Sequence, residues 1–196
     1  MFRQAVRRPS RGFTLIELMI VIALMAILIA LSVPSFRNMI EMQRLRGVHG
    51  ELATDLQFAR AEAAARGRYV RVNFGSSDTL TCYSIYTAPT SGTRCDCTLG
   101  AGAACPLGAQ EIKTTQVRRD SAVSFVLPTG QDTAFMFDYI SGGLVSSTTD
   151  TADVPLAAWQ VDTRIDDDRR LRTIIIQTGR PSSCAPNASA MQVTAC

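Results

Sequence analysis

The sequence predicts an α+β fold in which a long N-terminal helix, apolar at first and amphipathic later, packs on a C-terminal all-β domain of two sheets. Three observations support this prediction. Residues 13–33 form an almost unbroken apolar run, and residues 45–63 carry apolar side chains every three or four positions. After residue 67, short segments of alternating apolar and polar residues are separated by turn-rich stretches. These are the periodicities of a fully apolar helix, a surface helix and half-buried strands.

The apolar run is long enough to cross a bilayer. Its 21 residues would span roughly 32 Å as a helix at ~1.5 Å per residue. It exceeds the apolar core of an ordinary secretory signal and no A-x-A cleavage site follows it, so we expect it to be retained. Four arginines and no acid precede it: Arg3, Arg7, Arg8 and Arg11. This bias predicts a cytoplasmic N-terminus, with the rest of the chain on the other side of the membrane.

The run contains one charged residue, Glu17. A carboxylate within an apolar span costs about 2.5–3.5 kcal/mol on insertion scales, so it needs a compensating partner. Glu17 is either a charge tolerated one turn from the membrane interface or a carboxylate that pairs with a positive group from another chain.

The residues around Glu17 read Arg11-Gly12-Phe13-Thr14-Leu15-Ile16-Glu17-Leu18. This stretch resembles the prepilin motif of type IV pilins and type II secretion pseudopilins. The resemblance implies that a membrane prepilin peptidase cuts between Gly12 and Phe13 and methylates the new amine of Phe13. It also implies that Glu17 meets the Phe13 amine of a neighbouring subunit during assembly, and that the helix kinks at Pro34. Residues 1–12 would then be a cleaved basic leader and residues 13–34 a transmembrane and assembly helix.

Residues 35–66 are predicted to form an amphipathic helix that ends at Gly67. Its apolar stripe consists of Leu45, Val48, Leu52, Leu56, Ala59 and Ala63. The stripe could pair with a partner helix, but strands begin immediately afterwards, which favours packing on the chain's own β-domain. Asp55 is expected on the polar side. His49, beside the stripe, is expected to be half-exposed and structural.

Residues 67–196 are expected to form a β-rich exported domain with no later helix. The predicted strands are Tyr69–Phe74, Leu80–Tyr86, Glu111–Val117, Ala122–Leu127, Ala134–Ile140, Ala158–Ile165 and Leu171–Thr178. Residues 52–63 resemble the helix of the GspH/FimT family of minor pilins and pseudopilins. The Ile174-Ile175-Ile176 strand, followed by Thr178-Gly179-Arg180 and a C-terminal cysteine, resembles the close of the same family.

The six cysteines indicate disulfides and therefore an oxidising compartment. Cys95 and Cys97, with Cys82 and Cys105 nearby, could instead bind zinc, but their spacing differs from the usual C-x₂-C pair. Cys95 and Cys97 are too close to bridge each other comfortably, so each is expected to pair with Cys82 or Cys105. Cys184 and Cys196 would then enclose a C-terminal loop, as in many pilins.

Enzymatic chemistry is not expected. The chain has one histidine and one lysine, Lys113, and no nucleophile–base pattern is visible. The Asp166–Asp168 run lacks the ordered ligand spacing of a calcium loop and more plausibly forms a hairpin tip. We therefore expect no metal and no cofactor.

The expected function is that of a minor pilin that initiates a type IV pilus or lies at its tip, with a contribution to adhesion or DNA uptake. The alternative is a minor pseudopilin, of the H type, in a type II secretion system. Expected partners are other pilins or pseudopilins, the prepilin peptidase and the inner-membrane assembly platform. The expected location is the bacterial inner membrane, as a single-pass protein with a periplasmic C-terminal domain, and then the fibre.

Weak DNA binding is a further hypothesis. Some FimT-branch pilins bind DNA through a Gly-Arg-x-Arg motif, but here Gly179-Arg180-Pro181-Ser182 lacks the second arginine. The remaining candidates for phosphate contacts are Arg180, Arg172, Arg170 and Arg169. Cleavage of the leader would leave 16 basic against 17 acidic residues, so the mature chain has no basic surplus to strengthen binding.

Overall fold

The computed structural model describes residues 13–90, 92–147, 154–191 and 193–196, with the side chains of residues 31–35, 189 and 190 outside the description. The chain divides into two compact units, one ending at Ile40 and the other comprising Glu41–Cys196. Helix α1 (Leu15–Arg66) contributes to both units. Each unit is described by itself below.

Within the second unit, α1 packs on the β-domain through the predicted stripe. Five of its apolar side chains are fully buried: Leu45, Leu52, Leu56, Ala59 and Ala63. Val48 is partly buried against the same core. The helix ends at Arg66, and Gly67 follows with a φ of 61°, a left-handed conformation that glycine adopts without a steric penalty. The expectation that this helix packs on its own β-domain is confirmed.

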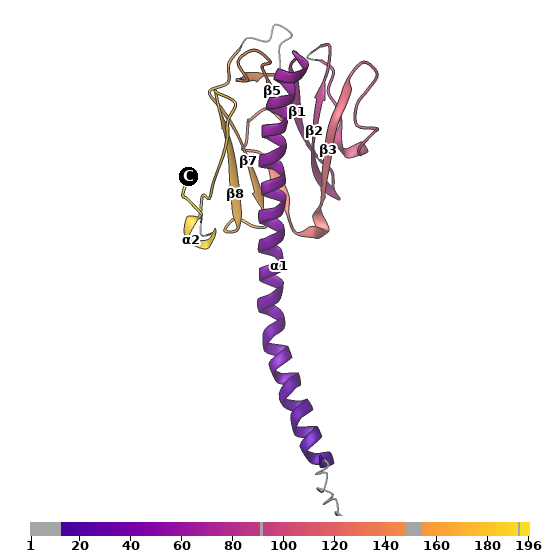
Figure 1. The fold of residues 1–196 in the computed structure, drawn as a ribbon, viewed down its shortest axis with the longest axis vertical. Helices are drawn as coiled ribbons and strands as arrows, with labels where there is room; N and C mark the ends of the chain where they lie inside the picture. The colour runs from indigo at the N-terminus through magenta and orange to yellow at the C-terminus, as the bar shows by residue number, and fades with distance from the viewer. Residues whose placement is uncertain (1–12, 91, 148–153, 192) are drawn as a thin grey trace, which may run out of the picture. The chain divides into compact units, whose positions relative to one another are not determined.

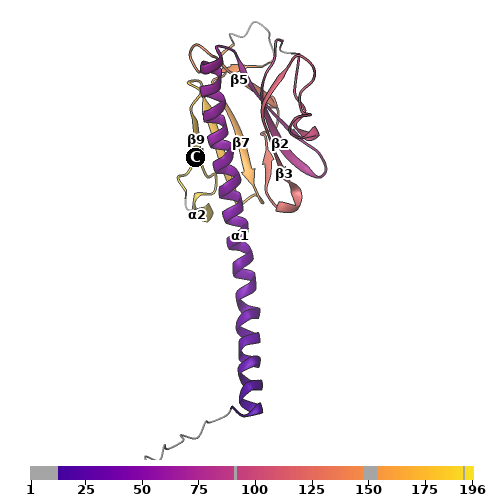
Figure 2. The same cartoon turned by 45° about the vertical axis from the view of Figure 1, so that its right-hand side comes forward.

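The strands of the second unit form two antiparallel sheets (Figures 1 and 2). The five-stranded sheet has the order β3-β2-β1-β5-β6 and consists of β1 (Val70–Ser76), β2 (Leu80–Thr87), β3 (Gln110–Arg118), β5 (Ala134–Phe137) and β6 (Leu144–Ser146). The four-stranded sheet has the order β4-β7-β8-β9 and consists of β4 (Ser124–Val126), β7 (Ala158–Arg164), β8 (Arg170–Ile176) and β9 (Pro181–Cys184). Short 3₁₀ turns, η1 (Cys97–Leu99) and η2 (Arg119–Ser121), lie in the connections.

An aromatic cluster joins the two sheets. The Trp159 ring, on β7, lies 4.5 Å from Phe135 of β5 and 5.0 Å from Phe74 of β1, measured between ring centroids. Because the tryptophan and its two phenylalanine partners belong to different sheets, their packing holds the sheets face to face. Such aromatic pairs contribute about 0.5–1.5 kcal/mol each beyond the area they bury.

Seven predicted strands are present, but three elements were not anticipated. Strands β6 and β9 have three and four residues, too few to show a period in the sequence. A one-turn helix, α2 (Ala188–Met191), corrects the expectation that no helix follows the strands. Strand β5 ends at Phe137, earlier than predicted, because Asp138 accepts backbone hydrogen bonds from Ile140 and Ser141 and turns the chain.

Candidate functional site

The motif residues at the start of α1 form a helix N-cap. The Thr14 hydroxyl accepts a hydrogen bond from the backbone N–H of Glu17 at 3.3 Å, and the first helical bond runs from Leu18 N to Thr14 O at 3.2 Å. Threonine followed three residues later by glutamate is the pattern of a capping box. The carboxylate of Glu17 also lies in the first turn, where the helix dipole favours negative charge. The motif therefore specifies where the helix begins, a role that our sequence analysis missed.

Apolar side chains cover every side of the first part of α1. All described side chains from Phe13 to Ala30 are exposed, including eleven large hydrophobic residues between Leu15 and Leu28. Glu17 is the one charge in this stretch. A helix that is apolar on all sides needs apolar surroundings on all sides.

No helical stretch of the described residues satisfies the combined length and apolarity requirements of a membrane-crossing segment.

Two of the predicted site residues are not fully described. Gly12 and the rest of the leader lie outside the described residues. Pro34 lies within α1, but its side chain is outside the description. The cleavage site and the kink at Pro34 therefore stay predictions.

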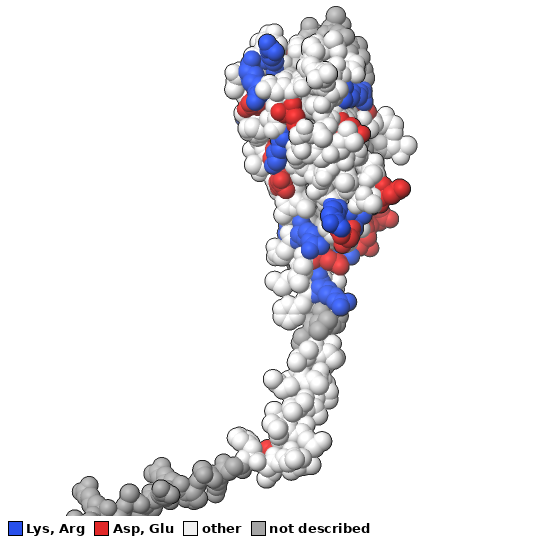
Figure 3. Space-filling view, turned by 90° about the vertical axis from the view of Figure 1, so that its right-hand side faces the viewer, with Lys and Arg blue, Asp and Glu red and all other residues white. Residues whose placement is uncertain are grey.

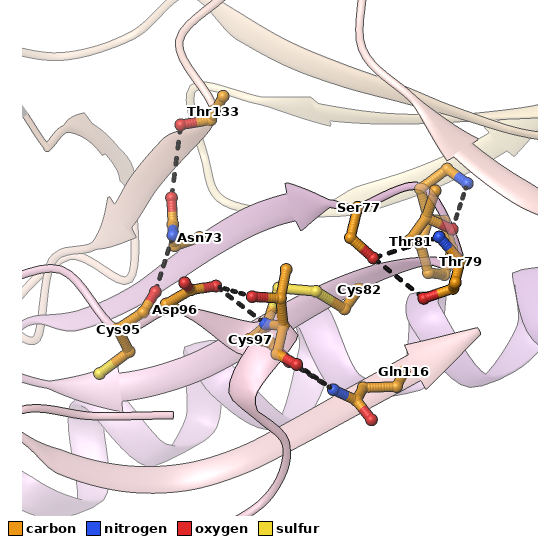
Figure 4. Close-up of a disulfide and its surroundings, with 12 residues drawn as sticks. Asn73, Ser77, Thr79, Thr81, Cys82, Cys95, Asp96, Cys97, Gln116 and Thr133 are labelled. Atoms are coloured by element: carbon orange, nitrogen blue, oxygen red, sulfur yellow. Dashed lines mark hydrogen bonds between the residues drawn. A yellow bond between two sulfur atoms is a disulfide. The ribbon is translucent and has the colours of Figure 1, made fainter. Parts of the chain in front are cut away.

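The six cysteines form three disulfides, which completes the pairing that the sequence left open. Cys82 pairs with Cys97, and Cys95 pairs with Cys105. The Cys82–Cys97 bond fastens the connection between β2 and β3 to the five-stranded sheet, because Cys82 belongs to β2 and Cys97 to η1, and Cys95–Cys105 closes a loop within that connection. Hydrogen bonds to the loop carbonyls reinforce them: Asn73 Nδ2 donates to Cys95 O at 2.9 Å and Gln116 Nε2 to Cys97 O at 2.7 Å (Figure 4).

The third disulfide, Cys184–Cys196, closes the C-terminal loop as expected. The loop returns beside the end of β9, where Ala185 donates to Thr194 O at 2.9 Å and pairs with Ala195 in a parallel bridge. This contact covers the end of an edge strand that would otherwise expose unpaired backbone groups.

Three of the four arginines proposed to contact DNA are engaged by carboxylates of the chain itself. Arg172 on β8 forms a two-pronged pair with Asp162 on β7, with contacts of 2.7 and 2.8 Å, and Arg170 lies 3.7 Å from the same carboxylate. Arg169 contacts Glu41 and Asp166, each at 2.7 Å. The Arg169–Glu41 pair holds the β7–β8 hairpin to the start of the second unit, and the guanidinium groups of Arg169 and Arg172 already have strong partners.

Arg180 differs from these three. It is exposed, and its guanidinium contacts no hydrogen-bond or ion-pair partner among the described residues. On the face of the C-terminal domain that Figure 3 shows, basic and acidic side chains are interspersed rather than gathered into one basic patch. Asp166–Asp168 form the turn between β7 and β8, as expected, and Asp166 accepts backbone hydrogen bonds from Asp168 and Arg169.

A buried polar cluster lies between α1 and the five-stranded sheet. Asp55, expected on the polar side of the helix, is buried instead. It accepts a hydrogen bond from the Tyr83 hydroxyl at 2.6 Å and lies 2.7 Å from the ammonium of Lys113. Burial, together with the hydrogen bond to Asp55, raises the pKa of Tyr83. Burial alone would lower the pKa of Lys113, but hydrogen bonds to Asp55 and Glu51 raise it. The only lysine of the chain thus neutralises a buried carboxylate.

His49 is also buried, which corrects the expectation of a half-exposed side chain. Its Nε2 lies 2.9 Å from the Ser183 hydroxyl of β9 and its Nδ1 lies 3.4 Å from the Thr163 hydroxyl of β7. Burial lowers the pKa of His49 to about 4, because the charged imidazolium is poorly solvated there. A neutral histidine therefore links the helix to the four-stranded sheet.

Two residues of the family-like segments meet at a junction of α1 and both sheets. Arg60 Nε, on α1, donates to the carbonyl of Gly142 in the β5–β6 turn at 2.9 Å. Gly179, in the β8–β9 turn, has a φ of 74°, and a Cβ there would overlap the same Gly142 carbonyl oxygen. Only a residue without a side chain fits this contact. Gly179 and Arg60 thus have structural roles in the fold.

Among the described residues, no group of three or more His, Cys, Asp or Glu side chains is arranged to hold a metal ion. The cap at Thr14 and the three disulfides are the features of this chain that stand out.

The chain is similar in sequence to known pilin and fimbrial proteins. The chain is 51% identical over 44 residues to a type IV major alpha-pilin of Moraxella bovis, covering 22% of this chain and 28% of that protein. It is 39% identical over 70 residues to fimbrial protein Q of the same organism, covering 36% of this chain and 44% of that protein. The chain thus spans less than half the length of these curated relatives. No solved structure matches it.

Two family models match, one to part of each unit. Residues 7–33 match the prokaryotic N-terminal methylation motif, which is found in membrane-anchored pilin-like proteins that are processed by a prepilin peptidase and assemble with one another. Residues 50–180, about two thirds of the chain, match the type II transport protein GspH. The predicted GspH/FimT relationship is confirmed: this chain belongs to the GspH family of pilin-like proteins.

Proposed function

We propose that this protein is a minor pilin that assembles through its N-terminal helix into a type IV pilus, where it initiates the fibre or lies at its tip. The observation that carries the proposal is the exposed apolar surface of residues 13–30, in which Glu17 is the only charged residue. Before assembly this surface would lie in the inner membrane, with the N-terminus cytoplasmic and the C-terminal domain periplasmic. After assembly the helices of neighbouring subunits would cover it.

Glu17 would select the position of each incoming helix. In an apolar bundle, an unpaired carboxylate is costly and the methylated amine of a neighbour's Phe13 is the natural counter-ion. Exposure of Glu17 leaves its carboxylate accessible to such a partner. The Thr14 cap keeps the residues that follow Phe13 helical, so that the amine and the carboxylate occupy defined places in each subunit.

Processing and assembly can be tested separately. Mass spectrometry of the mature protein should find N-methylated Phe13 as its first residue; an intact Met1 or a first residue beyond 30 would refute the proposal. Glu17→Ala should leave the protein inserted in the membrane but reduce its amount in sheared fibres at least tenfold. Asp78→Ala is the matched control, because Asp78 is an exposed carboxylate of the C-terminal domain. Equal incorporation of both variants would mean that Glu17 has no assembly role.

A second candidate is a minor pseudopilin of the H type in a type II secretion system, and the GspH match over residues 50–180 favours it. The two systems give different phenotypes when the gene is deleted. Loss of surface pili with normal export of secreted proteins would support the pilus. Periplasmic retention of secreted proteins with normal pili would support the secretion system. In either system the expected partners are other pilin-like subunits and the inner-membrane assembly platform.

A contribution to DNA uptake would rest mainly on Arg180, because Arg169, Arg170 and Arg172 are engaged within the chain. One free guanidinium predicts weak, salt-sensitive binding. A gel-shift titration at low salt should show a shift that Arg180→Gln removes and that Arg118→Gln, in which an exposed arginine paired with Asp120 is neutralised, retains. No shift at high micromolar protein would remove DNA from the proposal; adhesion would then be the remaining role for a tip subunit.

A further inference from the structure

We infer that a cavity at the end of α1 binds an acidic saccharide. The cavity has a volume of about 520 Å³ and lies where the turn after α1 meets the end of β2 and the residues that precede β3. This volume is within the range of roughly 300–1,000 Å³ that small-molecule sites occupy. The inference does not depend on which fibre the protein joins, because it concerns the C-terminal domain alone.

The cavity is lined by two aromatic rings that pack on each other and by backbone segments at glycines. Tyr69 and Tyr139 pack edge to face, with ring centroids 5.2 Å apart and an interplanar angle of 81°. Both line the cavity, together with Gly67 and Gly108, whose backbones have φ of 61° and 93° and whose missing side chains leave open space. A tyrosine ring offers an apolar face to the C–H groups of a sugar and a hydroxyl to its oxygens. Thr87, also in the lining, supplies a further hydroxyl.

Arg68 supplies a positive charge at the cavity. It lines the cavity, is exposed, and its guanidinium contacts no partner among the described residues. Arg66, two residues earlier, is instead paired with Glu62 and Gln110 and lies in the last turn of α1, where it offsets the negative end of the helix dipole. Arg68 is therefore available for an incoming anion, and a guanidinium matches a carboxylate with two parallel hydrogen bonds.

The arginine without a partner distinguishes this cavity from two others of similar size, in which the arginines already have hydrogen-bond or ion-pair partners. In the cavity between α1 and β3, Arg118 is paired with Asp120, and Arg44 donates to the Ser121 carbonyl. In the cavity at the edge of β4, Arg119 donates to Ser77 O and Arg164 is paired with Asp167. Neither of these has both an aromatic pair and a guanidinium without a partner in its lining. The combination at the end of α1 therefore favours a ring-shaped ligand that carries a carboxylate, which is the chemistry of a uronic acid.

The test uses the full mature chain in detergent micelles, titrated calorimetrically with digalacturonic acid. We expect saturable binding, and at least tenfold weaker binding of galactobiose, which has the same ring shape but no carboxylates. Arg68→Gln should weaken binding of digalacturonic acid about tenfold. Arg180→Gln is the matched control, since Arg180 is equally exposed and unpaired but lies outside the cavity, and it should bind as the unchanged protein does.

Three results would overturn the inference. The first is no binding up to about 10 mM digalacturonic acid. The second is equal loss in Arg68→Gln and Arg180→Gln, which would indicate non-specific charge attraction. The third is binding of a blocked aspartyl-leucine dipeptide, dependent on Arg68, without binding of the sugar acid; the site would then serve an acidic peptide. Thermal unfolding of each variant, unchanged within about 2 °C, confirms that the fold is intact.

Discussion

The two units of this protein differ in the exposure of their apolar side chains. From Phe13 to Ala30 every described side chain is exposed, and most of these side chains are apolar. From Glu41 onward a cluster of apolar side chains is buried in one core, and three disulfides close loops. The difference indicates which defects each unit should show. Substitutions in the first should act on assembly, and substitutions in the second should act on folding.

The largest effect on folding is expected for Gly179→Ala. The new Cβ would overlap the Gly142 carbonyl oxygen and would also require a left-handed backbone, so the β5–β6 and β8–β9 turns would have to separate. We expect a loss of about 3–4 kcal/mol in the free energy of unfolding. Gly130→Ala is the control, because its φ is also positive, at 82°, but its Cβ would meet nothing within 4 Å. It should cost about 1 kcal/mol. Similar losses in chemical denaturation would show that backbone strain, and not the junction, is responsible.

Acid should destabilise the second unit through His49. The pKa of His49 is lowered to about 4 in the folded chain, below its ordinary value of 6.5, so the unfolded chain binds the extra proton more readily between these values. Stability should therefore be complete above pH 6.5 and should fall as the pH drops toward 4, by up to about 3 kcal/mol. The measurement is the free energy of unfolding as a function of pH. A His49→Gln variant with the same pH dependence in this window would assign the effect to other groups.

Removal of the Cys82–Cys97 disulfide by a double Cys→Ser substitution should cost about 2–3 kcal/mol, because the bond closes a 15-residue separation and holds the η1 loop on β2. The matched comparison is the Cys184–Cys196 pair, with a separation of 12 residues at the C-terminal end. Loop entropy alone predicts nearly equal losses. A clearly larger loss for Cys82–Cys97 would show that the hydrogen bonds from Asn73 to Cys95 O and from Gln116 to Cys97 O depend on the Cys82–Cys97 bond.

The smallest effect on folding is expected for Glu17→Ala. The residue lies in the exposed apolar segment, so the melting temperature of the protein in detergent should change by less than about 2 °C, even though fibre incorporation falls. A large loss of thermal stability would contradict the expectation that substitutions in the first unit act on assembly alone, because Glu17 would then also support the fold.

Local sequence patterns were sufficient to predict the elements whose residue types recur every few positions. The prepilin-like motif, the stripe from Leu45 to Ala63, the stop at Gly67 and the seven longer strands could all be read from the sequence, since each depends on neighbours along the chain. The motif also identified Phe13 and Glu17 as candidate assembly residues without any knowledge of the domain that follows.

Tertiary structure alone decided the contacts between distant segments. Strands β6 and β9 exist because neighbouring strands supply their hydrogen bonds, which a three- or four-residue segment cannot signal. Asp55 is buried because Tyr83 and Lys113, 28 and 58 residues away, satisfy its carboxylate. The same applies to the pairing of Arg172 with Asp162 across two strands and to the choice of partner for each cysteine. Sequence periodicity reports which side of an element faces the core, whereas the identity of the group that lies opposite depends on how the whole chain folds.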